Sequence, residues 1–169
     1  LTYAPDNYYS TEEMVDICHD VAERGAVLSV HMRGEGDSLL GSVEEMVSIA
    51  RKSGVSVHIS HFKAAGRNNW GSITKAISLI DSARAEGLDI TCDVYPYTAC
   101  FSQFPYLMPP WAAEGGIAKT VERVKDPVTR QRIRSEMESR QESWDCMIYS
   151  TGWENVVISS VINPAHKRY

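Results

Sequence analysis

The stretch GVSVHISH, residues 54–61, decides the fold of this chain. It opens with a glycine suited to a helix C-cap, continues as a short run of apolar and β-branched residues, and ends on a histidine. The sequence after Gly25 follows the same plan, with Ala26–His31 as the strand, and a third version starts at Gly87, with Leu88–Tyr95 as the strand. The sequence therefore predicts three short strands, each entered through a glycine.

Helical periodicity fills the sequence before each of these glycines. Apolar residues recur at three- and four-residue spacing over Thr11–Arg24, from Leu39 onward and from Ile73 onward. Ser10 and Glu13 match a capping box at the start of the first helix. Strands that alternate with helices, at about 30 residues a unit, predict an α/β fold with a parallel sheet and right-handed crossovers. This sheet belongs either to a barrel or to an open doubly wound fold, and we expect both of its faces to be apolar under helices.

Residues 96–169 depart from this plan. Proline and aromatic residues are frequent in the first part, and we expect no regular structure there because proline interrupts helices and sheets. Asp126 followed by Pro127 predicts a helix N-terminus, with a polar helix through Met137. Two short extended segments are expected further on, Cys146–Ser150 and Val156–Val161. We interpret residues 96–169 as an inserted lid or small subdomain.

The amino-acid composition argues against a disordered protein, a membrane protein and a nucleic-acid-binding protein. The chain has 169 residues, of which 43% are hydrophobic and 23% charged, as in globular proteins. It has no apolar run long enough to span a membrane, and its net charge of −5 without a basic stripe argues against a nucleic-acid partner. The four cysteines form no C-x-x-C pair, and the sequence starts with no signal-peptide pattern, so we expect reduced thiols and a cytoplasmic protein.

Two histidines end two successive predicted strands. The loops after the carboxyl ends of parallel strands build the site in such folds, so His31 and His61 are expected on one rim. Neutral imidazole is the commonest zinc ligand, which makes the pair candidate metal ligands. The alternative is that each histidine only satisfies a hydrogen bond at a strand end. His58 lies within its strand, three residues before His61, and we interpret it as structural, on the opposite face.

Other polar residues are expected on the same rim. Arg33 and Lys63 each follow a candidate ligand by two residues, and a cation there suits a substrate carboxylate, unless it is only a solvated loop charge. Tyr95 ends the third strand and is either a substrate-orienting hydroxyl or part of the core of the lid. Asp93 is a candidate partner for a histidine, or a cap for a buried donor. Gly34–Gly36 is read only as a flexible loop.

Five motifs in order resemble the N-acyl-D-amino-acid deacylases (D-aminoacylases) of the amidohydrolase superfamily. They are residues 1–5 (LTYAP), 31–33 (HMR), 59–63 (ISHFK), 69–71 (NWG) and 93–99 (DVYPYTA). The resemblance implies a zinc-dependent hydrolase that cleaves the amide bond of N-acyl-D-amino acids, a linear C–N bond other than a peptide bond. It also implies a (β/α)8 TIM-type barrel, of which residues 1–95 would form about three βα units and residues 96–169 the inserted part.

The resemblance also assigns roles to residues. His31 and His61 correspond to metal ligands, Lys63 and Tyr95 to residues that hold the substrate carboxylate, and Arg33 to a less clearly defined position in the same motif. A His-x-His motif, a metal-binding cysteine and the catalytic aspartate of the family have no counterpart in this sequence. We therefore expect no catalytic residue here and a fragment that is inactive alone.

Two other functions stay open at this stage. One is a cyclic-amide hydrolase of the dihydroorotase or hydantoinase kind, and Lys63 favours a linear substrate with a free carboxylate over it. The other is a non-catalytic α/β fragment. The expected partner is a small N-acyl amino acid, with no nucleic acid and no membrane. Because three units leave open sheet edges, self-association of the isolated chain is also expected.

Overall fold

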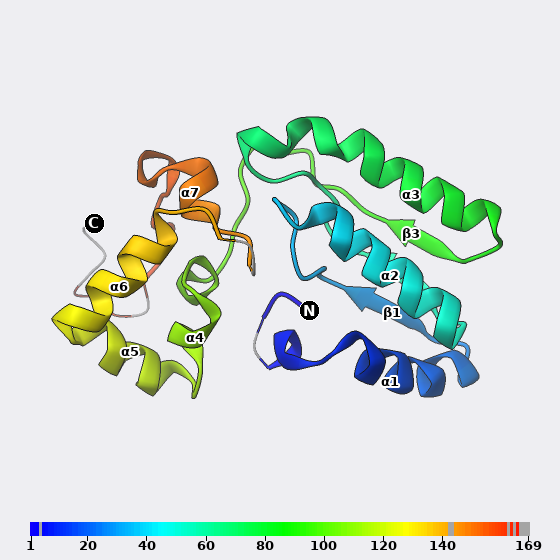
Figure 1. Cartoon of the computed structure of the whole chain (residues 1–169), viewed down its shortest axis with the longest axis horizontal. Coiled ribbons are helices and arrows are strands. Elements are labelled where there is room, and N and C mark those ends of the chain that lie inside the picture. The colour runs from blue at the N-terminus through cyan, green and yellow to red at the C-terminus, as the bar shows by residue number, and fades with distance from the viewer. Residues whose placement is uncertain (4, 142–143, 162, 164, 166–169) are drawn as a thin grey trace.

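Three βα units make up the first half of the computed structural model, which describes residues 1–3, 5–141, 144–161, 163 and 165 (Figure 1). The helices in this half are α1 (Thr11–Glu23), α2 (Leu39–Ser53) and α3 (Ile73–Ala85), and the strands are β1 (Val27–Val30), β2 (Ser56–Ile59) and β3 (Ile90–Cys92). Two short 3-10 helices, Asp6–Tyr8 and Arg67–Ser72, precede α1 and α3. The predicted alternation of helices and strands is confirmed, although each strand is shorter than expected.

The three strands form one parallel sheet in the order β1-β2-β3. Val30 pairs with Ile59, and Ile59 pairs with Cys92, so the carboxyl ends of all three strands lie at one edge. The loops that follow the strands therefore meet at that edge, which places the loop after β1 beside the loop after β2.

In the described part of the chain, helices α1–α3 cover one face of this sheet and leave the other open. The strand residues that point toward α1–α3 are buried, among them Val30, Val57 and Ile59. The expectation that both faces would be apolar is wrong. Ser29 and Thr91 are exposed and His58 is half-buried, because side chains alternate along a strand and these residues point away from the helices.

Local sequence signals set the element ends as predicted. Ser10 and Glu13 form both hydrogen bonds of a capping box at the start of α1. Gly54 ends α2 in the left-handed region with φ 76°, a conformation that glycine adopts without steric cost. Asp126 caps α6 by accepting a hydrogen bond from the backbone N–H of Thr129, with Pro127 at the first helical position.

The second half is helical. It contains α4 (Pro110–Ala113), α5 (Ile117–Lys125), α6 (Pro127–Met137) and α7 (Met147–Thr151), with 3-10 turns at Phe104–Leu107 and Trp153–Asn155. Two expectations are wrong. The prolines do not prevent regular structure, because they occupy the first turns of short helices, where a missing N–H costs nothing. Residues 147–151 are helical, and residues 156–161 belong to no strand.

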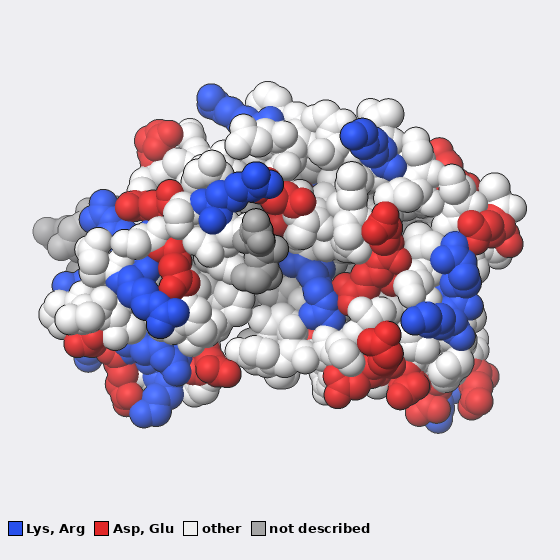
Figure 2. Space-filling view, viewed as in Figure 1, with Lys and Arg blue, Asp and Glu red and all other residues white. Residues whose placement is uncertain are grey.

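Two hydrophobic clusters organise the described residues. The larger joins α1, α2 and α3 to the covered face of the sheet, and the smaller joins α4, α6 and α7. A cleft of about 1240 Å³ lies between them and is lined from both sides, for example by Tyr3, Arg33 and Trp111. On the face shown in Figure 2, cationic and anionic side chains are interspersed, in keeping with local pairs such as Arg132–Glu136. Within the described part of the chain, no helix combines the length and the apolar character needed to cross a bilayer.

Candidate functional site

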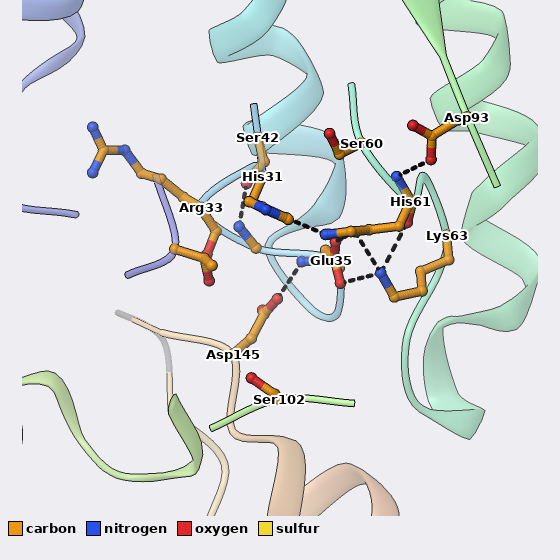
Figure 3. Close-up of polar contacts among 12 residues, drawn as sticks. His31, Arg33, Glu35, Ser42, Ser60, His61, Lys63, Asp93, Ser102 and Asp145 are labelled. Carbon is orange, nitrogen blue, oxygen red and sulfur yellow. Dashed lines mark hydrogen bonds and ion pairs between the residues drawn. The ribbon is translucent and has the colours of Figure 1, made fainter. Parts of the chain in front are cut away.

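The side chains of His31 and His61 meet at the carboxyl edge of the sheet (Figure 3). His31 directly follows β1, and His61 lies just beyond the end of β2. Nδ1 of His31 faces Nε2 of His61, and the ring centroids are 4.3 Å apart. Burial, and next the neighbouring His61, lower the pKa of His31, which favours its neutral, metal-binding form. The structure thus brings the two residues together on one rim, while their role as ligands stays a prediction.

A carboxylate on the neighbouring strand end fixes the backbone of His61. Asp93 Oδ1 accepts a hydrogen bond of 2.7 Å from the backbone N–H of His61, and Oδ2 lies 2.9 Å from Nε2 of His58. These hydrogen bonds, that from His58 first, lower the pKa of Asp93. His58 also contacts the Thr91 hydroxyl at 2.8 Å. His58 therefore acts on the same carboxylate as the backbone of His61, an arrangement that strand alternation alone did not predict.

Lys63, Tyr95 and Glu35 surround the other side of the His61 ring. The Lys63 ammonium lies 2.9 Å from Nδ1 of His61 and 2.5 Å from Oε2 of Glu35. It also lies 5.3 Å from the centroid of the Tyr95 ring. Burial raises the pKa of Tyr95 to about 12, so its hydroxyl stays protonated and able to donate a hydrogen bond. Lys63 and Tyr95 thus lie together beside the histidine pair.

Glu35 is the site residue that the sequence interpretation missed. Only 8% of its surface is exposed, and Oε1 lies 2.6 Å from Nδ1 of His61. That distance is within ion-pair range, but the approach lacks hydrogen-bond geometry, and among the described residues Oε1 has no hydrogen-bond partner. An acidic residue in the loop directly after a histidine-ending strand was the available signal. The interpretation of residues 34–36 as a flexible loop gave Glu35 no role.

Arg33 points away from the histidine pair (Figure 3). Its Nε lies 3.0 Å from both carboxylate oxygens of Glu45 on α2, and its other nitrogens donate to the backbone carbonyls of Asn7 and Tyr9. These contacts tie the N-terminal segment to α2. A substrate-binding role for Arg33 stays a prediction. It would require the guanidinium to bind a substrate in addition to Glu45 and the two backbone carbonyls.

The potential metal-ligand side chains at this rim can be compared with the needs of a zinc site. Among the described residues, no group of three or more His, Cys, Asp and Glu side chains is placed to hold a metal ion. The facing nitrogens of His31 and His61 are two potential ligand atoms in direct contact, and zinc sites commonly have four ligands. Carboxylates typically hold the second nitrogen of a metal-binding histidine, and Glu35 lies beside that nitrogen of His61. The two nitrogens therefore fit two of the four positions of a zinc site.

The comparisons agree on one group of enzymes, although no family model matches the chain. The chain is 35% identical over 97 residues to the N-acyl-D-glutamate deacylase of Alcaligenes xylosoxydans xylosoxydans and 36% identical over 97 residues to the D-aminoacylase of the same organism. Each match covers 57% of this chain but 20% of the relative. The chain thus spans about a fifth of the length of these relatives.

Solved structures give the same result. The N-acyl-D-glutamate deacylase of Bordetella bronchiseptica, solved with zinc and a phosphonate that mimics the tetrahedral intermediate, is 33% identical with a TM-score of 0.56. A D-aminoacylase described as defining a novel subset of amidohydrolases is 38% identical with a TM-score of 0.54. Each match covers 57% of this chain and 20% of the solved one.

Proposed function

Because this chain is homologous to one part of the much longer N-acyl-D-amino-acid deacylases, we propose that it carries part of the active site of such an enzyme. The proposed reaction is the metal-dependent hydrolysis of the amide bond of an N-acyl-D-amino acid. The observation that carries the proposal is the convergence of four side chains. His31 and His61 face each other, and Lys63 and Tyr95 lie directly beside them.

The two histidines would hold zinc through Nδ1 of His31 and Nε2 of His61. When bound, zinc would supply Lewis-acid chemistry, which lowers the pKa of water and polarises a carbonyl. Zinc and a binuclear metal centre are named for the solved relatives, which supports this choice of metal. We propose no residue of this chain as the catalytic base, and we expect a carboxylate from outside it to move the proton.

Lys63 and Tyr95 would bind the free carboxylate of the substrate. Lys63 has 21% of its side chain exposed and already holds the Glu35 carboxylate, which shows that an anion fits beside its ammonium. The protonated hydroxyl of Tyr95 would donate a second hydrogen bond. A carboxylate held here would place the adjacent amide next to the histidine pair, as the proposed hydrolysis of an N-acyl amino acid requires.

The fold proposal follows from the same homology. We propose that residues 1–95 form three βα units of a (β/α)8 barrel, with the polar face of the sheet turned toward the barrel interior. Exposed Ser29 and Thr91 support this, because a face that packed on further helices would be apolar. We propose residues 96–169 as an inserted subdomain, supported by a second hydrophobic cluster within them.

The test uses the full-length protein and N-acetyl-D-amino acids. We expect zinc-dependent turnover, and we expect His61→Ala to lower kcat/KM at least about 100-fold, because metal stabilisation of the transition state is worth several kcal/mol. His19→Ala, the same substitution on the exposed surface of α1, is the matched control and should change little. Wild-type turnover by His61→Ala would remove His61 from the site.

A further inference from the structure

The carboxylate of Asp145 binds the loop that carries Glu35. Asp145 is 7% exposed, and its Oδ2 accepts hydrogen bonds from the backbone N–H groups of Glu35 at 2.5 Å and Gly36 at 2.6 Å. Its Oδ1 accepts from the backbone N–H of Ser38 at 3.1 Å and from the Ser38 hydroxyl at 2.8 Å. Successive backbone amides that converge on an anion form a concave binding site for it. Here residues 34–38, the Glu35 loop, enclose a carboxylate supplied from the second half of the chain.

The two glycines of the Glu35 loop permit this close approach. A Cβ atom at Gly34 would lie 2.6 Å from Oδ2 of Asp145 and would also collide with the Ser38 hydroxyl. A Cβ atom at Gly36 would lie 3.2 Å from Cγ of Asp145. These glycines have no positive φ, so the space left for Asp145, not the backbone conformation, accounts for them.

Further hydrogen bonds connect the Glu35 loop to the segment after β2 and to the second half of the chain. The carbonyl of Glu35 accepts a hydrogen bond of 2.7 Å from the backbone N–H of Ala65 in the loop after β2. The Asp37 carboxylate binds Asn69 at 2.9 Å and Arg140 at 3.1 Å. The backbone of the loop is therefore held by Ala65 through the carbonyl of Glu35 and by Asp145 through three backbone N–H groups.

We propose that Asp145 is a positioning residue, which holds the Glu35 loop so that the Glu35 carboxylate lies between His61 and Lys63. In this position the Glu35 carboxylate lies beside Nδ1 of His61, on the side of the ring away from His31, and it keeps the Lys63 ammonium beside Tyr95. The role in metal binding rests on the function proposed above, but the geometric role does not. Residues 96–169 thus act on the site from a distance, through a buried carboxylate.

The test compares Asp145→Asn with wild type in the full chain. Asparagine keeps the shape of the side chain but replaces one acceptor oxygen with an amide that cannot accept from a backbone N–H. We expect hydrogen exchange at the amides of Glu35 and Gly36 to accelerate at least about 10-fold. We also expect the ring nitrogen resonances of His61 to shift, because the Glu35 carboxylate no longer keeps its place beside Nδ1. Asp126→Asn is the matched control, because Asp126 caps α6 within the same half of the chain and should leave both readouts unchanged.

Zinc affinity, measured in the full-length protein by competition with a chelator, supplies the second readout. We expect Asp145→Asn to weaken zinc binding about 10-fold, as is usual for residues that support a ligand, and to add less than about 2-fold in a Glu35→Gln background. The same 10-fold loss in both backgrounds would show that Asp145 acts through stability alone and would overturn the proposal. Unchanged exchange at Glu35 and Gly36 would also overturn it. If the protein bound no zinc, the proposed function would fail. The hydrogen-exchange rates at Glu35 and Gly36 and the His61 resonances would still show whether Asp145 positions the Glu35 loop.

Discussion

Asp93 accepts a hydrogen bond from the backbone N–H of His61 at 2.7 Å, and His61 is the only non-glycine residue with a positive φ, 44°, in the described part of the chain. A left-handed conformation is uncommon for a residue with a side chain and persists where the surroundings hold it. Asp93 is the carboxylate that holds it, with His58 fixing the other oxygen. The orientation of the His61 ring toward His31 therefore depends on Asp93.

This dependence predicts the effect of Asp93→Ala. Without the carboxylate, the His61 backbone loses its partner and the ring samples other directions, so zinc affinity of the full-length protein should fall by about 10- to 100-fold. Asp89→Ala, an exposed position just before β3, is the matched control. Chelator competition measures both variants. Equal zinc affinity in Asp93→Ala and wild type would contradict the role given to Asp93.

Arg33 and Glu45 should behave as a pair that stabilises the fold. The guanidinium is bound by Glu45 and by two backbone carbonyls, so Arg33→Lys and Glu45→Gln should each lower the free energy of unfolding by about 1–2 kcal/mol. The double variant should lose less than the sum, because the two changes remove one interaction. Urea unfolding measures this. A rise in KM with Arg33→Lys that Glu45→Gln does not share would instead support contact with substrate.

Lys63 should discriminate between substrates by their charge. For an N-acetyl-D-amino acid, Lys63→Met should lower kcat/KM about 10- to 100-fold, since a hydrogen bond to a charged group is worth about 1.5–3 kcal/mol. For the corresponding carboxamide, which has no negative charge, the same variant should change little. Lys75→Met, on the exposed side of α3, controls for loss of a surface charge. An equal loss with both substrates would mean that Lys63 does not bind the carboxylate.

The isolated chain should self-associate. β1 and β3 are the two edges of the described sheet, and each presents unpaired backbone groups, while the uncovered sheet face includes exposed Val27. Open edges of this kind pair with other strands. Light scattering at increasing protein concentration should show a mass above 18.9 kDa. A constant monomer mass across the concentration range would refute the prediction.

The sequence predicted those parts of the site that depend on local patterns. His31 and His61 were recognised because each follows an apolar run bounded by a glycine, and parallel pairing then brings strand ends together. Ser10 and Asp126 were recognised as helix caps for the same reason: the chemistry lies within one helical turn. Lys63 and Tyr95 were expected on the same rim because they follow their strands.

Features that depend on distant partners were not predictable in this way. The backbone of Glu35 is held by Asp145, which is 110 residues further along the chain. The residues next to Glu35 in the sequence give no indication of that contact. The segment around Ile148 forms α7 instead of the expected strand. A short apolar run has no periodicity that distinguishes a helix from a strand, so its secondary structure depends on how it packs in the smaller hydrophobic cluster. The second contact of Asp93, to His58, required the register of β2 against β3.

The most direct test of the central claim, that His31 and His61 bind one metal ion, is zinc X-ray absorption spectroscopy on the full-length protein. We expect imidazole scattering in the wild type and the loss of one imidazole contribution in each of His31→Gln and His61→Gln. His19→Gln should give the wild-type spectrum. Wild-type imidazole scattering in both His31→Gln and His61→Gln, at equal zinc occupancy, would contradict the claim.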